Sequence, residues 1–586
     1  MTNDVAAAVL HDPRHDCWYR YCEPVKTLRT SDLEKVDATL EKVEAYVADR
    51  GMFAVGYLSY EAAPAFDAAL ATRPAGRLPL VSFTLYRSRE VCEPPGPISA
   101  DLPIWQGPAP LDTYANTLSR LRGEIGAGNV YQVNFTDRLW AGGVDAEALF
   151  AAIGDKAPFG AYLQDGSHTI VSASPELFFE LDGELLTCRP MKGTAHRGLS
   201  AEQDQAQARW LACSEKNRAE NLMITDMVRN DLGRVADPGS VVVPGLFQVE
   251  QYPTVWQMTS TVQARTNASV LQIFRALFPG ASITGAPKRA SMALIRELEE
   301  TPRGVYTGAI GVMAPQRKAQ FSIAIRTACI ETATGSAQYG VGGGIVWDSS
   351  VNEEYQELHA KRRVLDVQRQ EFALLETMRW QGEGGVLLLE THLQRLRNSA
   401  RYFAYPYDAE AVRDVVEQIT AGLGDEPRRL RLLLDKTGAI SMEHHTLASD
   451  ENPQALMLAA QQIDSTNPLL YHKTTQRSIY DEALASVPPG YEVLLHNERG
   501  MVTESNIANV VYRLDGALYT PPVDDGLLPG TLRGYLLREG VIAERSLPLA
   551  EIPLVEAWFL INALRGWRDA NYVVSEKALP TNPHGA

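Results

Sequence analysis

The segment from Arg189 to Gly198 (Arg-Pro-Met-Lys-Gly-Thr-Ala-His-Arg-Gly) contains a lysine that could act as a nucleophile. The alternating run from Glu184 to Cys188 predicts a strand, which places Lys192 where that strand ends. Gly193 and Thr194 allow the backbone to turn there without steric cost. A lysine attacks carbon only as the neutral amine, so this role needs particular surroundings. Because a single lysine is more often a solvated charge, the assignment depends on the other motifs of the chain.

Three glutamates have positions that could form a cation site. Glu354 and Glu357 are three residues apart on a predicted helix, so they share a face on which two carboxylates repel by roughly half a kcal/mol. Mg2+ would remove this cost, because it binds a few carboxylates and keeps waters or substrate oxygens as its other ligands. Glu220, on another predicted helix, could complete the set. The alternative is two solvated helix faces.

Two glycine-containing segments could bind an anion. Thr284-Gly285-Ala286-Pro287-Lys288 leads into a helix predicted through Glu300, whose free N–H groups would form an anion site. Gly340 to Ile345 (Gly-Val-Gly-Gly-Gly-Ile) can bring backbone amides close to a carboxylate.

The chain has 586 residues, a length that exceeds what one hydrophobic core usually supports. The elements that must position the residues above alternate between strands and helices. The patterns predict strands at 52–60, 78–86, 129–136, 308–313, 319–327 and 337–341, and helices at 30–49, 111–127, 206–233 and 269–278. A soft boundary falls at Asp366–Glu371. We therefore expect one domain at 1–368, with a catalytic core at about 110–366, and a second at 372–586.

Composition and charge exclude several classes of protein. A formal net charge of -17 argues against a nucleic-acid binder, which would carry a basic stripe. Six scattered cysteines without a CxxC pair predict neither a zinc site nor a disulfide framework, and they fit a reducing cytoplasm. No apolar run approaches the ~20 residues that span a bilayer, and no basic segment typical of a signal peptide begins the chain. We expect a soluble cytoplasmic protein that binds no membrane.

Seven ordered motifs resemble the chorismate-utilising enzymes, a family that includes anthranilate synthase, isochorismate synthase and aminodeoxychorismate synthase component I. The motifs are Ser174–Glu176, Pro190–Thr194, Arg218–Arg234, Thr284–Lys288, Ile325–Thr327, Gly342–Ile345 and Glu354–Glu357. The resemblance covers roughly residues 110–366. It implies an α/β fold class, with a large sandwich of two sheets and helices outside.

Lys192 favours the aminodeoxychorismate synthases within that family, because anthranilate synthases have alanine at this position. In that subfamily the lysine attacks C2 of chorismate and displaces the C4 hydroxyl, after which ammonia enters at C4. The resemblance implies Glu176 as the general acid for the departing hydroxyl. It also implies Mg2+ ligands and substrate ligands, namely Glu220, Glu354 and Glu357 for the metal and Arg326, Thr284, Gly285, Lys288, Gly342, Gly343 and Gly344 for the substrate. A separate glutaminase subunit would supply the glutamine-derived ammonia.

Three positions depart from the pattern of the family. Met191 replaces the commoner isoleucine, and Asn217 stands where relatives often have an acidic group. Gln257 stands where many relatives have histidine, so a proton-handling role at that position is not expected.

From Phe372 to about residue 575 the chain resembles the fold-type IV pyridoxal-phosphate enzymes. The motifs are His392–Leu396, His472–Arg477, Val502–Ile507, Leu528–Arg533 and Asn562–Gly566. The resemblance implies a smaller α/β domain in which Lys473 holds pyridoxal phosphate and moves protons, and Glu504 faces the pyridine nitrogen. It implies that Arg395 and Thr531 bind the phosphate and that Asn562 lines the site, although Thr531 and Asn562 could instead cap helices. A homodimer formed through this domain is also expected.

Three activities share this second fold, namely branched-chain transamination, D-amino acid transamination and aminodeoxychorismate lyase. Sequence pattern separates them poorly. The fusion favours the lyase, because the product expected from the first domain carries an amine at C4, and loss of its enolpyruvyl group gives pyruvate and 4-aminobenzoate, a folate precursor. The alternative is an anthranilate-type synthase fused to a class IV aminotransferase.

Overall fold

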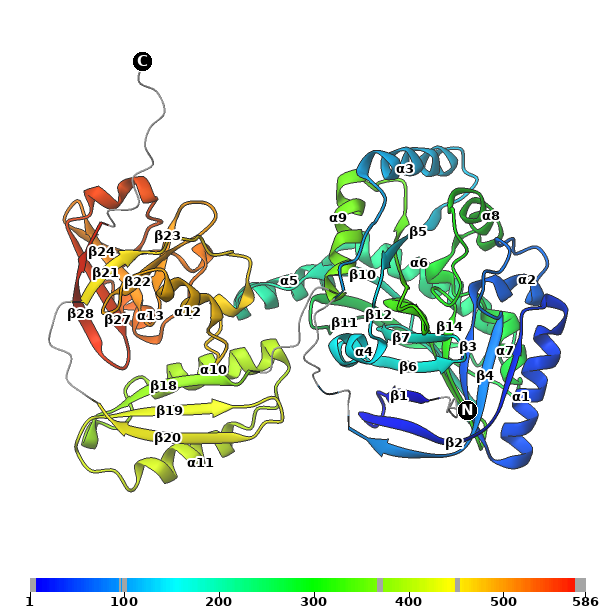
Figure 1. The fold of residues 1–586 in the computed structure, drawn as a ribbon, viewed down its shortest axis with the longest axis horizontal. Helices are drawn as coiled ribbons and strands as arrows, with labels where there is room; N and C mark the ends of the chain where they lie inside the picture. The colour runs from blue at the N-terminus through cyan, green and yellow to red at the C-terminus, as the bar shows by residue number, and fades with distance from the viewer. Residues whose placement is uncertain (1–6, 94–95, 97–102, 366–371, 448–453, 575–586) are drawn as a thin grey trace, which may run out of the picture. The chain divides into compact units, whose positions relative to one another are not determined.

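The computed structural model describes residues 7–93, 96, 103–365, 372–447 and 454–574, and the chain forms two compact units. Unit 1 comprises residues 1–196 and 208–369, and unit 2 comprises residues 197–207 and 370–586 (Figure 1). The predicted boundary at Asp366–Glu371 lies outside the described residues. In the part of the chain that the structure describes, no helix is long and apolar enough to cross a membrane.

Unit 1 is built on 17 strands that form one hydrogen-bonded ladder. The strands are β1 (Ala8–Asp12), β2 (Cys17–Thr30), β3 (Phe53–Leu58), β4 (Val81–Cys92), β5 (Gln132–Ala141), β6 (Phe159–Asp165), β7 (His168–Ser174), β8 (Leu177–Asp182), β9 (Leu185–Cys188), β10 (Met191–His196), β11 (Val242–Gln251), β12 (Val255–Arg265), β13 (Gly285–Ala286), β14 (Ala309–Ala314), β15 (Lys318–Ile323), β16 (Thr327–Glu331) and β17 (Ala337–Ile345). The α-helices are α1 (Val36–Arg50), α2 (Ala63–Phe66), α3 (Leu111–Gly126), α4 (Ala146–Ile153), α6 (Glu215–Gly233), α7 (Val270–Leu277), α8 (Lys288–Leu298) and α9 (Val351–Arg362), while α5 (Ala201–Cys213) crosses the division between the units.

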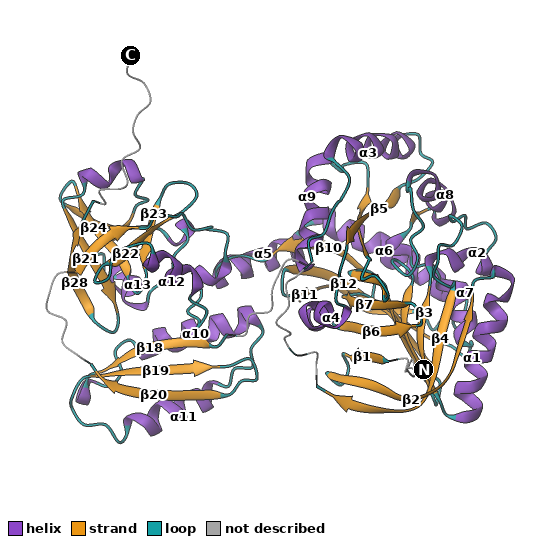
Figure 2. Cartoon of the chain, in the orientation of Figure 1, coloured by secondary structure: helices purple, strands orange, loops and turns teal. Residues whose placement is uncertain are grey.

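The ladder folds into two layers. Antiparallel pairing runs from β5 through β17, β16, β7, β6 and β1 to β2, and onward through β4, β3, β14, β15, β8 and β9 to β12. One buried cluster joins Tyr57 and Ile310 from the second half with Leu163 and Ile170 from the first, so the two halves face each other. The helices cover the outer faces, α1, α6 and α7 on one and α3, α4 and α9 on the other (Figure 2). The predicted α/β fold class is confirmed.

Unit 2 has two sheets. Its strands are β18 (Leu374–Trp380), β19 (Arg428–Leu434), β20 (Ile440–Thr446), β21 (Gln454–Leu458), β22 (Glu492–His496), β23 (Val502–Ser505), β24 (Asn509–Leu514), β25 (Ala517–Thr520), β26 (Ala543–Glu544), β27 (Ala557–Asn562) and β28 (Gly566–Tyr572), and its α-helices are α10 (Leu389–Phe403), α11 (Ala409–Thr420), α12 (Ser478–Ala485) and α13 (Thr531–Arg538). Strands β18, β19 and β20 form an antiparallel sheet whose apolar face packs against α10 and α11. Strands β21, β22, β23, β24, β27 and β28 pair in a closed ring.

The backbone around Lys192 differs from the prediction. Strand β9 ends at Cys188, and Lys192 is the second residue of β10. The register of β10 against β12 shifts between Met191 and Thr194, and Gly193 has a left-handed φ of 95°. A β-bulge of this kind re-aims the side chains beside it and recurs next to active sites. The prediction failed because an alternating run shows where one strand is, but not that the next strand begins three residues after it ends, at Met191.

A test of the unit 1 core is Phe321→Ala. The Phe321 side chain is fully buried, and its ring centroid lies 5.0 Å from Phe274 and 5.2 Å from Phe179. We expect the substitution to lower the free energy of unfolding by about 3–5 kcal/mol, because a cavity remains where the ring was. Urea denaturation measures the change. Leu185→Ala is the control, since Leu185 is 43% exposed and should change stability by less than about 1 kcal/mol.

Candidate active sites

Lys192 lies among carboxylates in unit 1. A Cβ atom added to Gly344 of β17 would collide with the Lys192 ammonium, so the lysine lies directly against that strand. The charge of Lys192 acts to lower the pKa values of Glu176, Glu354 and Glu357. The structure therefore brings together five residues that lie up to 181 positions apart in the sequence, from Glu176 to Glu357.

Glu176 is a buried acid in the connection between β7 and β8. Its exposed fraction is 4%, and Ser282 donates a hydrogen bond of 2.7 Å to its Oε1. Burial raises the pKa of Glu176 to about 7, although the Ser282 hydroxyl and the charge of Lys192 oppose the shift. A carboxyl with this pKa can donate a proton near neutral pH. Sequence reasoning missed Ser282, which lies in the loop just before the Thr284–Lys288 motif.

The three glutamates predicted as metal ligands are not assembled. Ser349 donates to Glu354 at 2.6 Å, and Lys361 forms an ion pair with Glu357 at 2.7 Å. Within the described ranges no group of three or more His, Cys, Asp or Glu side chains is arranged to hold a metal ion. Burial raises the pKa of Glu354, and the neighbouring Glu357 adds to the effect. Two hard oxygen donors therefore fit a cation such as Mg2+, and Glu220 is not brought to them.

Arg326 is the residue predicted to bind a carboxylate of the substrate. It follows β15 with a left-handed φ of 50°, and burial lowers the pKa of its guanidinium. No carboxylate among the described residues forms an ion pair with it. A desolvated cation without a counter-ion favours an anionic ligand.

The glycine motif forms strand β17 rather than a loop. Gly342 and Gly344 pair with Thr136 and Asn134 of β5, whereas the pairing of β17 with β16 ends at Tyr339. From Gly340 onward the second edge of β17 therefore has no strand partner in the described chain. Unpaired strand edges expose N–H and C=O groups that can bind a ligand. Gly343 lies between these residues on the same strand, and the Gly342 carbonyl accepts from Lys361 at 2.6 Å.

The Thr284–Lys288 motif has a structural role. Thr284 donates to the Gly280 carbonyl at 3.0 Å, and Gly285 pairs with Val133, where a side chain would collide with β5. Lys288 forms an ion pair with Asp231 at 3.0 Å, so its charge is already compensated. The motif thus packs α8 against β5, and its predicted contact with substrate stays a prediction.

The departures at Asn217 and Gln257 support the backbone beside Lys192. Gln257 donates to the Gly193 carbonyl at 2.9 Å and accepts from Thr194 at 3.1 Å. The Asn217 side chain lies 3.1–3.2 Å from the place that a Gly193 Cβ would occupy. These contacts fix the bulge that orients Lys192.

In unit 2, a cavity of about 350 Å³ is lined by all five predicted cofactor residues, Lys473, Arg395, Glu504, Thr531 and Asn562. Leu375 of β18 donates its N–H to the Lys473 carbonyl at 2.9 Å, which anchors the lysine to a rigid strand. Burial and the charge of Arg395 lower the pKa of Lys473 to about 8, while Glu376 opposes the shift. The amine can therefore hold or release a proton near neutral pH.

Arg395 is oriented by a buried acid that sequence reasoning missed. Its guanidinium donates two hydrogen bonds to Glu376, at 2.9 and 2.6 Å. Glu376 also contacts His392 at 2.6 Å, and the other ring nitrogen of His392 lies 3.3 Å from the Thr531 hydroxyl. Burial alone would raise the pKa of Glu376, but the charge and hydrogen bonds of Arg395, together with His392, lower it to about 2. The available signal was a single acid within the otherwise uncharged strand segment from Leu374 to Met378.

Glu504 is a second buried carboxyl with a raised pKa. Its oxygens accept from the Tyr480 hydroxyl at 2.8 Å, the Leu528 N–H at 3.2 Å and the Asn509 amide at 3.0 Å. Burial raises its pKa to about 7 against these bonds. Glu504 also pairs with Asn509 in the bridge that closes the strand ring.

Thr531 and Asn562 occupy different structural positions. Thr531 is the first residue of α13, so it could bind an anion together with the free amides there. Asn562 ends β27, and it accepts the N–H of Arg565 at 2.7 Å in the turn to β28. Asn562 therefore caps a turn rather than a helix.

The two halves of the chain match two protein families. Residues 99–366 match the family described as chorismate binding enzyme, and residues 373–572 match the family described as amino-transferase class IV. The chain thus contains a chorismate-binding enzyme domain followed by a class IV aminotransferase domain, and both resemblances drawn from the sequence are confirmed.

Individual relatives cover the first domain. The chain is 44% identical over 257 residues to aminodeoxychorismate synthase from Streptomyces pristinaespiralis, covering 43% of this chain and 36% of the relative. It is 43% identical over 262 residues to aminodeoxychorismate synthase component 1 from Salmonella typhimurium, covering 44% and 57%. The chain therefore spans between about a third and three fifths of these relatives. The crystal structure of anthranilate synthase component I from Streptococcus pneumoniae superposes with a TM-score of 0.52 at 21% identity, covering 62% of this chain and 93% of that structure, which shows the shared fold.

A class IV aminotransferase domain implies pyridoxal phosphate, and the unit 2 cavity fits this group. Lys473 presents an amine, and Glu504 presents a buried carboxyl to a basic ring nitrogen. Arg395 and the start of α13 present a cation and N–H groups to a phosphate. These are the contacts that the aldehyde, ring and phosphate of the cofactor require.

The network around Glu376 predicts an acid-sensitive step in stability. A carboxyl whose folded pKa is depressed from 4.5 to about 2 stabilises the fold above pH 4.5 and loses that contribution as pH falls toward 2. We expect about 3 kcal/mol of unfolding free energy to depend on this group. Urea unfolding from pH 6 to pH 3 should show the decline in the natural chain.

Glu376→Gln should be less stable at pH 7, because Arg395 stays buried without its counter-charge, and should lack this part of the pH dependence. Glu390→Gln is the control. Glu390 pairs with Arg413 on the surface, so its removal should leave the pH dependence nearly unchanged. A parallel decline in the natural chain and Glu376→Gln would contradict the assignment.

Proposed function

We propose that unit 1 converts chorismate and ammonia to 4-amino-4-deoxychorismate and water, and that unit 2 converts this product to 4-aminobenzoate and pyruvate. One observation carries the proposal. Each unit places a lysine beside a buried carboxyl whose pKa is about 7, namely Glu176 near Lys192 and Glu504 near Lys473. The names of the relatives support the first reaction.

In unit 1, Lys192 is the nucleophile and Glu176 is the general acid. The Lys192 amine attacks C2 of chorismate while both ring double bonds shift and the C4 hydroxyl leaves as water with the proton of Glu176. Ammonia then adds at C4 and gives a proton back to Glu176, both double bonds shift back and Lys192 departs from C2. Arg326 binds a substrate carboxylate, and the open edge of β17 from Gly342 to Gly344 holds the substrate against Lys192.

Mg2+ is the proposed metal of unit 1. Glu354 and Glu357 would supply two oxygen ligands, which is typical of Mg2+ sites that keep waters or substrate oxygens. Glu220, which is not grouped with these two glutamates in this structure, is the proposed third ligand and would have to approach them when the metal binds. Lys361, which now pairs with Glu357, would have to release it.

In unit 2, Lys473 is the residue that moves the proton of the substrate. Pyridoxal phosphate, when bound, supplies an electron sink for the carbon that bears the substrate amine. Lys473 takes the proton from C4, the enolpyruvyl group leaves as pyruvate and the ring becomes aromatic. Glu504 holds a proton near the cofactor ring, and Arg395, fixed by Glu376, holds the phosphate with Thr531.

The walls of the unit 2 cavity favour the lyase over a transaminase of simple amino acids. Leu430 and Leu432 of β19 point into the core, so Arg429 and Arg431 alternate onto the opposite face, and both line the cavity. Arg565 lines it from the β27–β28 turn. 4-Amino-4-deoxychorismate carries two carboxylates, for which several arginines are suitable partners.

The partner and assembly are part of the proposal. The relative from Salmonella is named component 1, which supports a separate glutaminase component as the source of ammonia. We also propose a homodimer formed through unit 2 and a cytoplasmic location.

The test of both reactions is a product assay on the full chain with chorismate, Mg2+, ammonium and pyridoxal phosphate, read by mass. We expect 4-aminobenzoate and pyruvate. Lys192→Ala should abolish both products, whereas Lys473→Ala should accumulate 4-amino-4-deoxychorismate, because it removes only the second step. Anthranilate as the product would show an anthranilate-type synthase instead.

The raised pKa of Glu176 predicts the pH dependence of amination. As pH rises through about 7 the acid loses its proton, so at constant free ammonia the rate should fall toward tenfold per pH unit. Glu176→Gln should lose about 10²–10⁴-fold in rate.

Ser282→Ala is the matched variant for this test. The Ser282 hydrogen bond lowers the pKa of Glu176, so its removal should move the decline to higher pH. A rate that stays flat from pH 6.5 to pH 8.5, or a decline that moves lower in Ser282→Ala, would exclude Glu176 as the acid.

A further inference from the structure

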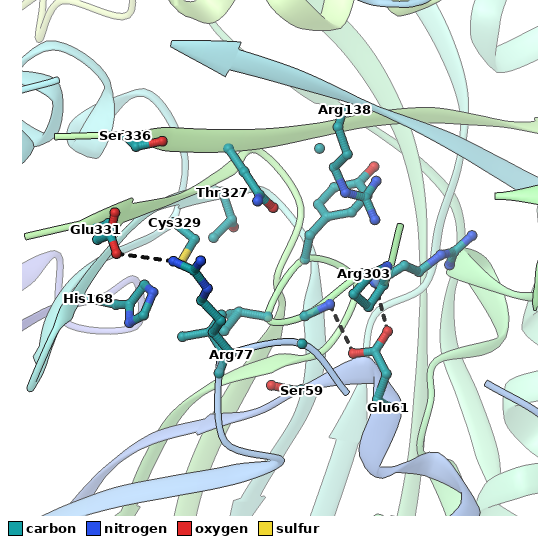
Figure 3. Close-up of a pocket in the computed structure, with 18 of the residues that line it drawn as sticks. Ser59, Glu61, Arg77, Arg138, His168, Arg303, Thr327, Cys329, Glu331 and Ser336 are labelled. Atoms are coloured by element: carbon teal, nitrogen blue, oxygen red, sulfur yellow. Dashed lines mark hydrogen bonds and ion pairs between the residues drawn. The ribbon is translucent and has the colours of Figure 1, made fainter. Parts of the chain in front are cut away.

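Unit 1 contains a second cavity, of about 440 Å³, that the proposed reaction does not use. Its walls include Arg138 of β5 and Thr327 and Cys329 of β16 (Figure 3). Trp140 of β5 and Tyr306 also line it. The volume lies in the range of small-molecule sites.

The cavity is separate from the site at Lys192 although both lie on one face of the β5–β17 pair. Gly340 opposite Arg138 belongs to the cavity, and Gly344 opposite Asn134 belongs to the Lys192 site. Side chains of a buried ion pair fill the face between them. Glu299 accepts from Thr136 at 2.8 Å, and Arg303 donates to the Asn134 carbonyl at 2.7 Å.

Arg138 gives the cavity an unused donor. The residue is 6% exposed, and one of its terminal nitrogens is buried without any hydrogen-bond partner. The other terminal nitrogen donates to Thr136 and to the Asp137 carbonyl, both at 3.1 Å. Figure 3 shows Arg138 entering the cavity from the side opposite Glu61. A buried guanidinium nitrogen without an acceptor is costly, and an anionic oxygen would remove the cost.

The remaining walls limit the charge and shape of the ligand. Glu61 and Glu331 line the same cavity together with two further arginines, Arg77 and Arg303, so Arg138 adds one positive charge to walls that otherwise balance, which suits a ligand with one negative charge. Glu61 accepts from the N–H groups of Arg303 and Gly304, and Glu331 pairs with Arg77 at 3.3 Å. The apolar surface comes from two aromatic rings and from Leu78 and Val305.

We propose that this cavity binds a ring-bearing monocarboxylate, whose carboxylate accepts from the free Arg138 nitrogen and whose ring packs on Tyr306 and Trp140. The choice of probe rests on the proposed function. Its final product, 4-aminobenzoate, is a flat monocarboxylate whose amine could donate a hydrogen bond to Glu331 or Gln338, which also line the cavity.

The test is titration calorimetry of the full chain with 4-aminobenzoate and with the neutral 4-aminobenzamide, with hydrogen exchange locating the site. We expect 4-aminobenzoate to protect peptides at 76–78, 302–306 and 327–340, and to bind there at least tenfold more tightly than the amide, because a charged hydrogen bond is lost. Absence of protection in these peptides at saturating ligand would overturn the proposal.

Two variants connect the binding to the residues. Arg138→Met should remove the preference for carboxylate over amide, and unchanged affinity in this variant would exclude the cavity. Trp140→Ala is a second variant, and it leaves the buried Glu299–Arg303 network untouched. Because Trp140 is 41% exposed, the substitution should weaken binding without unfolding the chain.

The two proposals fail separately. Binding needs no turnover, so protection of these peptides in a chain that makes no 4-aminobenzoate would refute the proposed function and retain the cavity. Synthesis of 4-aminobenzoate without protection of these peptides would support the proposed function and refute the cavity as a binding site.

Discussion

The chemistry of both units depends on the burial of ionisable groups. Water stabilises a charged carboxylate or ammonium, so removing water raises the pKa of an acid and lowers that of a lysine. Glu176 and Glu504 are brought to about 7 in this way, and Lys473 to about 8. Two unrelated folds thus each contain groups that exchange protons near neutral pH. The rest of each unit excludes water from these groups and fixes their orientation.

The surrounding structure holds these groups by different means. In unit 1, a bulge at Gly193, fixed by Gln257, orients Lys192 between the layers of a sandwich. In unit 2, Glu504 lies at the bridge that closes a ring of strands, and Glu376 locks Arg395 with two hydrogen bonds. Because strands and buried ion pairs permit little movement, they position side chains better than loops do.

The sequence could predict the site residues that lie within short motifs. It could not predict contacts between distant segments of the chain. The five predicted cofactor residues that line the unit 2 cavity each belong to a short motif, as do Lys192 and Glu176. The partner of Lys288 is Asp231, 57 positions away, and no local pattern encodes that ion pair. Glu354 and Glu357 share a helix face, as their spacing required, but the position of Glu220 relative to them depends on how α6 packs. Arg197, which stands only five residues after Lys192, belongs to unit 2, where it binds Asp204.

The walls of the unit 2 cavity help to distinguish a lyase from a transaminase, a distinction that membership of the family leaves open. A transaminase and a lyase both begin by removing a proton from the carbon that bears the amine, so Lys473 and Glu504 serve either reaction. The two differ in what the substrate carries beyond that carbon. A simple amino acid has one carboxylate, whereas a dicarboxylate can engage both Arg429 and Arg431 of the β19 face, although Arg431 also pairs with Glu443 at 3.0 Å. A binding site discriminates most strongly against a ligand that leaves the polar groups of the site unpaired. Arg429 and Arg431 therefore favour the dicarboxylate that unit 1 would produce.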